Sequence, residues 1–69
     1  MYRNLNAEQA RKGMTNQEVS ERLGISRTSY EKKKKTGKFV VREVVALCKL
    51  FGCGFEYLFE NSDLNNNVA

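Results

Sequence analysis

The chain has 69 residues, which is enough for one small domain with one modest core and excludes a large multi-layer enzyme. It carries 12 Lys and Arg against 8 Asp and Glu, a formal charge of +4, and seven of the basic residues fall within residues 27–42 beside a single acidic one. Such a concentration of positive charge is typical of proteins that meet nucleic acid or another anionic surface.

Several residue types are absent or scarce, and this narrows the chemistry. The chain has no His, Pro or Trp, so His-based triads and four-ligand Cys/His zinc sites are excluded, and we expect no metal, cofactor or small-molecule ligand. Its two cysteines, Cys48 and Cys53, are few for a disulfide scaffold, and we interpret them as reduced thiols of a cytoplasmic protein. No apolar run approaches the length of a membrane span, and the first residues are polar rather than those of a signal core.

The first predicted helix covers residues 3–12. Leu5, Ala7 and Ala10 lie at helical spacing, and basic residues followed by Gly13 suit a helix end. A second helix begins at Thr15, which is followed three residues later by Glu18 as in a capping box. Its inward face is predicted to consist of Val19, Ser20 and Leu23.

The third predicted helix runs from residue 27 to about residue 34 with Ser26 as its N-cap, and Tyr30 is its only large apolar side chain. Only Gly24, Ile25 and Ser26 separate it from the second helix, and so short a connection makes the two helices cross steeply. With Tyr30 turned inward, a rotation of about 100° per residue turns the polar residues outward. These outward residues are Thr28, Glu31, Lys32 and Lys35, with Arg27 near the helix start.

The C-terminal half is more apolar. Residues 39–45 alternate as a strand could, but positions 44, 47, 48 and 51 form a helical stripe, so we predict a helix over residues 42–51 that ends at Gly52. Residues 54–59 predict a last short helix whose aromatic side chains join the core or a subunit interface. The folded domain is expected over residues 1–60. Four of residues 61–69 are asparagines, and this segment is predicted to form a disordered polar tail.

The chain resembles the helix-turn-helix domain of phage repressors and Cro proteins, the lambda-repressor-like family. Four segments carry the resemblance: residues 7–15, 18–27, 50–52 and 57–59. The resemblance covers about residues 4–60 and implies an all-α compact bundle of four to five helices, the third of which inserts into the major groove of operator DNA. One position departs from the family: Lys33 stands where an apolar residue is usually buried. We expect either that its stem covers the core with the ammonium in solvent, or that the third helix ends early.

The resemblance also implies which residues bind DNA. In the family the residue that opens the second helix contacts a phosphate, and Asn16 holds that place here. The base-reading positions match Arg27, Thr28 and Lys32, with Ser26 and Glu31 as helpers. The full predicted DNA-binding set is Asn16, Gln17, Ser26, Arg27, Thr28, Glu31, Lys32, Lys35 and Lys38.

The function predicted from this pattern is sequence-specific binding of double-stranded operator DNA by a phage or prophage repressor, not an enzymatic reaction. Because one helix reads only a few base pairs, a homodimer is expected, assembled either before binding or only on DNA. The resemblance implies that residues 55–59 form the dimer surface. Two alternatives remain open at this point. One is an antitoxin or antirepressor-like module that covers a protein partner, and the other is a non-specific binder of nucleic acid or RNA.

Overall fold

The computed structural model describes residues 2–60, and the predicted disordered tail at 61–69 lies outside the described residues. The described chain forms five helices: α1 (Arg3–Arg11), α2 (Asn16–Leu23), α3 (Arg27–Thr36), α4 (Val41–Phe51) and α5 (Phe55–Leu58). The all-α prediction is confirmed. The strand considered for residues 39–45 is wrong, since most of that segment is the first half of α4.

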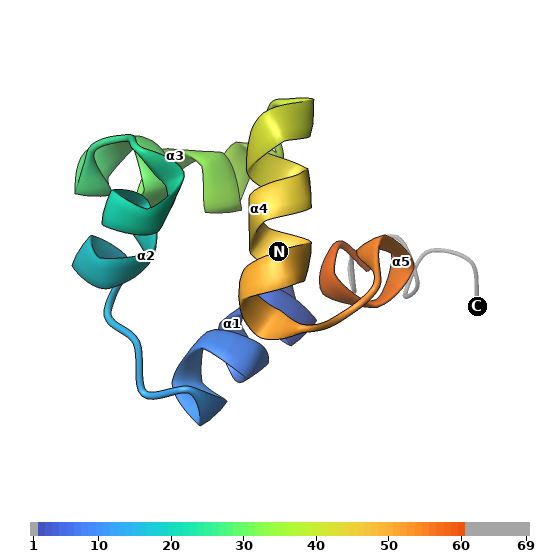
Figure 1. Ribbon diagram of the computed structural model, residues 1–69. Coiled ribbons are helices and arrows are strands. Elements are labelled where there is room, and N and C mark those ends of the chain that lie inside the picture. Colours follow the sequence, from blue (N-terminus) through green and yellow to red (C-terminus); the bar gives the residue numbers. More distant parts are fainter. Residues whose placement is uncertain (1, 61–69) are drawn as a thin grey trace.

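The helices surround one small core. Figure 1 shows α2 and α3 packed together on one side of α4, with α5 on its other side and α1 beneath. Every helix contributes at least one buried apolar side chain, so no helix is dispensable for the core. The buried apolar residues are Leu5, Val19, Leu23, Tyr30, Leu47, Phe51 and Leu58.

The connection between α2 and α3 forms as its residues predict. Thr15 Oγ1 accepts the Glu18 N–H at 3.1 Å, and the Glu18 carboxylate accepts the Thr15 N–H at 2.9 Å, which completes the capping box. Gly24 ends α2 with φ +73°, a conformation that a side chain would strain. Ser26 Oγ then accepts the Ser29 N–H at 3.1 Å and starts α3. Ser20 is fully buried where α2 meets α3, so the two backbones approach closely.

The inward face of α1 is more polar than its apolar spacing indicates. Ala7 and Ala10 are exposed, and Leu5, Glu8 and Gln9 form the inward face of α1. Polar residues on an inward face can be buried when they find hydrogen-bond partners. In α5 only Leu58 is buried, whereas Phe55 and Tyr57 are 58 % and 44 % exposed, so these two aromatic side chains lie outside the core.

Aromatic rings fasten α5 to the rest of the domain. The Phe59 ring lies 5.5 Å from both the Tyr2 and the Phe39 rings in edge-on contacts, and 5.4 Å from the Phe55 ring in a stacked contact. Tyr2 precedes α1 and Phe39 precedes α4, so these contacts tie three distant parts of the chain together.

Both expectations for Lys33 are wrong. α3 does not end early but continues to Thr36. The Lys33 ammonium is not in solvent either: it donates to both carboxylate oxygens of Glu43, at 2.9 and 3.1 Å. Glu43 is 2 % exposed and also accepts the Val40 N–H at 3.0 Å, so it caps α4 and anchors α3 with the same carboxylate.

Candidate nucleic-acid interface

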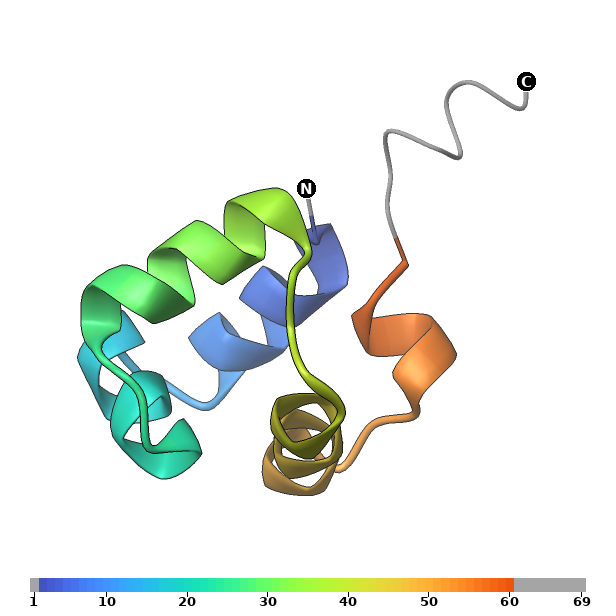
Figure 2. The same ribbon diagram turned by 90° about the horizontal axis from the view of Figure 1, so that it is seen from above.

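One long side of α3 faces away from the bundle. Figure 2 shows α3 along the periphery of the domain, with α1 and α2 behind it. The predicted base-reading residues Arg27, Thr28 and Lys32 are all exposed, and so is Lys35 one turn further on. Ser26 is exposed as well, although its hydroxyl is engaged as the cap of α3. The outer face of this helix therefore presents cations and a hydroxyl that can meet phosphates and base edges.

The start of α2 lies beside this face. Gln17 is exposed and donates to the Glu21 carboxylate at 2.9 Å. Asn16 is half-buried and is the first residue of α2, where the positive end of the helix dipole favours an anion. The hydrogen bond from Asn16 to Glu31 places the start of α2 next to α3, which is the arrangement that a phosphate contact beside that helix requires.

Lys38 lies apart from the other predicted residues. It follows Gly37, which ends α3 in a left-handed conformation, and it is exposed. Its backbone N–H reaches the Thr36 hydroxyl at 3.4 Å. An α3 of 10 residues is about 15 Å long, so Lys38 is separated from Arg27 by the whole helix and could meet only a more distant phosphate.

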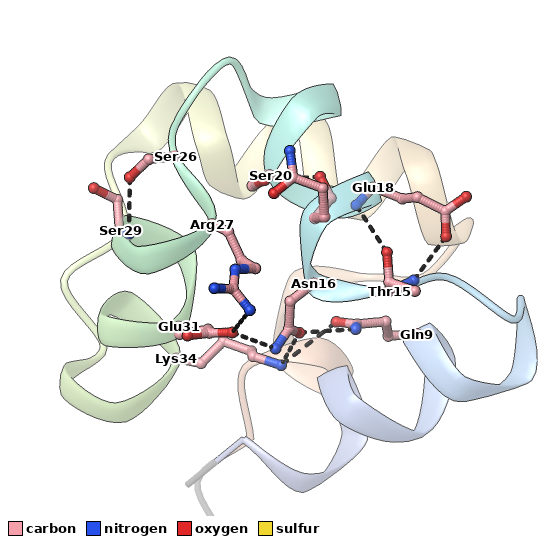
Figure 3. Close-up of polar contacts among 11 residues, drawn as sticks. Gln9, Thr15, Asn16, Glu18, Ser20, Ser26, Arg27, Ser29, Glu31 and Lys34 are labelled. Carbon is pink, nitrogen blue, oxygen red and sulfur yellow. Dashed lines mark hydrogen bonds and ion pairs between the residues drawn. The ribbon is translucent and has the colours of Figure 1, made fainter.

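Glu31 links the two parts of the interface, as Figure 3 shows. Its carboxylate accepts a hydrogen bond from Asn16 Nδ2 at 3.1 Å and lies 3.8 Å from the guanidinium of Arg27. The Arg27 and Glu31 side chains are 59 % and 39 % exposed, so the ion pair itself contributes little to stability. The Glu31 carboxylate thus lies between Asn16 of α2 and Arg27 of α3.

Sequence reasoning missed two residues behind this surface, Gln9 and Lys34. The Gln9 amide donates to Met14 O at 3.1 Å and to Asn16 Oδ1 at 2.9 Å, while its oxygen accepts the Tyr30 hydroxyl at 2.7 Å. Burial raises the pKa of that hydroxyl. Gln9 follows Leu5 by one helical turn, and this spacing is the signal that could have identified it as an inward-facing residue.

Lys34 turns inward from the same helix that carries the exposed cations. Its ammonium donates to Asn6 Oδ1 and to Asn16 Oδ1, both at 2.9 Å, and lies 4.8 Å from the centre of the Tyr30 ring. Burial lowers the pKa of the Lys34 ammonium, and the nearby Glu31 carboxylate opposes that shift. Its position four residues after the buried Tyr30 is the pattern that indicates this orientation.

The run of four lysines is therefore divided between two roles. Lys32 and Lys35 are exposed on the outer face, whereas Lys33 and Lys34 are held by Glu43 and by amide oxygens of α1 and α2. A shallow hollow at the border of the two sets is lined by Asn6, Asn16, Glu31, Lys34 and Lys35. Only part of the positive charge of residues 27–42 is thus available to an external anion.

Within residues 2–60 there is no group of three or more Cys, Asp or Glu side chains arranged to hold a metal ion. Over the same residues no helix is long and apolar enough to cross a membrane.

Comparison with known proteins identifies a family. Residues 4–63 match the family described as the Cro/C1-type HTH DNA-binding domain, which is most of the chain. Searches of curated proteins and of solved structures gave no significant match. The helix-turn-helix of α2 and α3, the cationic outer face of α3 and this match lead to one conclusion: the chain belongs to the Cro/C1-type helix-turn-helix family of DNA-binding transcription regulators.

Proposed function

We propose that this regulator is a sequence-specific repressor of the phage or prophage type, which occupies an operator overlapping a promoter and so keeps polymerase away. The observation that carries the proposal is the outer face of α3, where Arg27, Thr28 and Lys32 are exposed together beside the start of α2. A regulator of this kind works in the cytoplasm, where the genome is accessible to it.

The proposed contacts are of two kinds: contacts to phosphates, which position the protein on DNA, and contacts to bases, which read the sequence. Asn16, Gln17, Lys35 and Lys38 are proposed to contact phosphates and so to fix the register of α3 on the duplex. Asn16 Nδ2 carries two protons, and among residues 2–60 only Glu31 accepts one of them, which leaves the second for a phosphate. Arg27 can donate two hydrogen bonds to guanine, and Thr28 can contact a thymine methyl group.

Selection of binding sites from random duplexes tests the proposal directly. The expected result is one enriched sequence with two-fold symmetry and half-sites about 34 Å apart, because two copies of α3 must enter successive major grooves on one side of the DNA. Retention of duplexes without any enriched sequence would identify a non-specific binder instead. Failure to retain duplexes at all would favour an antitoxin or antirepressor-like module.

The affinity for DNA is expected to fall steeply as salt is added. With the four exposed cations Arg27, Lys32, Lys35 and Lys38 near the DNA, the slope of log affinity against log salt concentration is about −4 per protomer, because each cation that neutralises a phosphate releases a condensed cation from the DNA. Fluorescence anisotropy of a labelled duplex between about 50 and 200 mM salt measures this slope. A flat dependence would contradict the electrostatic part of the proposal.

We propose that the dimer forms through α5 and the residue that follows it. Phe55 is 58 % exposed and stacks on Phe59, and Tyr57 is 44 % exposed, so α5 presents apolar surface that a partner could cover. In Figure 1 the helices α3 and α5 lie on opposite sides of α4, so DNA at α3 and a second protomer at α5 can be bound together.

Replacing Phe55 by Ser is expected to weaken self-association at least about 10-fold without unfolding the domain, because loss of one buried aromatic at an interface costs about 2 kcal/mol or more. Sedimentation with and without operator DNA measures it. Val41→Ser is the matched control, since Val41 is 80 % exposed but belongs to α4. A strict monomer on operator DNA would contradict the dimer, and an effect confined to Val41→Ser would move the interface to α4.

A further inference from the structure

We infer that Lys34 is a positioning residue of the DNA-binding surface, which fixes the side-chain amide of Asn16 and, through Glu31, the guanidinium of Arg27. The inference rests on the proposed sequence-specific function, since it assigns to an inward-facing residue a part in base selection. Lys34 does not reach DNA itself in this arrangement.

The surroundings of the Lys34 ammonium are unusual for a lysine in a run of cations. It donates to side-chain oxygens from two other helices, Asn6 of α1 and Asn16 of α2, and Gln9 Oε1 lies at 3.5 Å. The face of the Tyr30 ring covers it from a further side. An ammonium surrounded in this way is held in place by directional hydrogen bonds. It contacts side chains of the domain and is not free to bind an external phosphate.

Hydrogen-bond chemistry then dictates how the Asn16 amide is turned. An ammonium can only donate, so the atom of Asn16 that faces Lys34 must be the oxygen. Gln9 Nε2 donates to the same oxygen at 2.9 Å and reinforces this choice. The Asn16 nitrogen is thereby directed to the other side, where it donates to Glu31.

Glu31 transmits this orientation to the base-reading face. With one carboxylate oxygen bound by Asn16 Nδ2 at 3.1 Å, the carboxylate stays within 3.8 Å of the Arg27 guanidinium. The chain of contacts therefore runs from Lys34 through Asn16 and Glu31 to Arg27, as Figure 3 shows. Prepositioned donors discriminate between bases more strongly than freely rotating ones, because a misplaced base cannot be accommodated by a change of rotamer.

Lys34→Met tests the inference, since methionine fills a similar volume and cannot donate. The Asn16 amide can then rotate, and Glu31 and Arg27 lose their fixed positions. The expected result is a roughly 10-fold fall in the ratio of operator affinity to random-duplex affinity, the size of one weakened base contact, with the salt slope unchanged. Thermal unfolding is recorded alongside, and binding is measured well below the unfolding temperature of each protein.

Lys35→Met is the matched control, because Lys35 is the exposed neighbour on the same helix. It is expected to show the opposite pattern, a salt slope less steep by about one unit with the affinity ratio retained, as for a phosphate contact. If Lys34→Met behaved in this way, Lys34 would be a phosphate contact and the inference would be overturned. An unchanged ratio with an unchanged slope would overturn it equally.

Nuclear magnetic resonance of the protein without DNA separates the inference from the proposed function. In the unaltered protein, the Lys34 ammonium protons should exchange slowly enough to be observed, whereas those of Lys35 should not. In Lys34→Met the Asn16 side-chain amide signals should shift and exchange faster, and in Lys35→Met they should not. If no operator is found, these signals still support or overturn the placement of Asn16, and the ammonium signal does so even if the variant fails to fold.

Discussion

Arg27→Ala is expected to lower the affinity for a selected operator by roughly 10- to 100-fold for each half-site, and the losses of the two half-sites combine in a dimer. The reason is that Arg27 is exposed at the first turn of α3, where its guanidinium can donate to both acceptors of a guanine. Affinity for random duplexes should fall much less, because one charge contributes only one phosphate contact. Competition between operator and random duplexes measures both losses.

Two further variants decide how Arg27 acts. Arg27→Lys keeps the charge but lacks the planar fork, so it should lose selectivity while retaining the salt slope. Lys49→Ala removes one cation from the last turn of α4 and should leave the affinity ratio unchanged. Equal losses on operator and random DNA in Arg27→Ala would show that this residue contacts a phosphate and does not read a base.

Lys33→Ala is expected to destabilise the domain by about 3 kcal/mol, which corresponds to a fall in melting temperature of roughly 15 °C for a chain of this size. Glu43 is 2 % exposed in the unaltered protein, and the substitution removes the cation that its carboxylate contacts. Because small domains have a total stability of only about 5 to 10 kcal/mol, this is a large fraction of the total. Thermal unfolding followed by circular dichroism measures the change.

The exposed neighbour Lys32 provides the control, because Lys32→Ala on the same helix should change stability by less than about 0.5 kcal/mol. The double variant Lys33→Met/Glu43→Gln should recover much of the loss, since it removes the buried charge and keeps an acceptor for the Val40 N–H. A Lys33→Ala protein as stable as Lys32→Ala would contradict the importance of the ion pair.

The pH dependence of stability offers a second measure of this ion pair. Burial alone would raise the pKa of Glu43, but hydrogen bonds from Lys33 and the Val40 N–H outweigh it and hold the pKa below the ordinary 4.5. The stabilisation is therefore present above about pH 4.5 and is lost as the pH falls through the lowered value. The pKa of Glu8 is also lowered, chiefly by the hydrogen bond from Arg11, so Glu8 adds its own pH dependence. The relevant quantity is therefore the difference in stability between wild type and Lys33→Ala, which should shrink in acid.

The helix-turn-helix could be predicted from the sequence because its signals are local. The capping box of Thr15 and Glu18 and the Ser26 cap each act within four residues, and both are confirmed. The outward face of α3 followed from the inward position of Tyr30 and the helical period, and the exposure of Arg27 agrees with it.

What could not be predicted depends on partners that are distant in the sequence. Lys33 meets Glu43 ten residues away, and Lys34 meets Asn6 at a separation of 28. The sequence of α3 alone does not indicate that Lys33 and Lys34 have hydrogen-bond acceptors, because those acceptors come close only when α3 packs against the other helices. The predicted helix, which ends at about residue 34, is shorter than the observed α3 for the same reason. The sequence around Lys33 indicates a solvent-facing side chain as long as its carboxylate partner is unknown.

The split of the lysine run has a consequence for how binding preference can change over evolutionary time. Thr28 and Lys32 are exposed and separate from the interior contacts of α3, so substitutions there can adjust the preferred operator with little cost to folding. Arg27 is different, because its carboxylate neighbour Glu31 is shared with Asn16. Divergent descendants of this chain would therefore vary independently at positions 28 and 32, whereas a new residue at position 27 would also change the surroundings of Glu31 and Asn16.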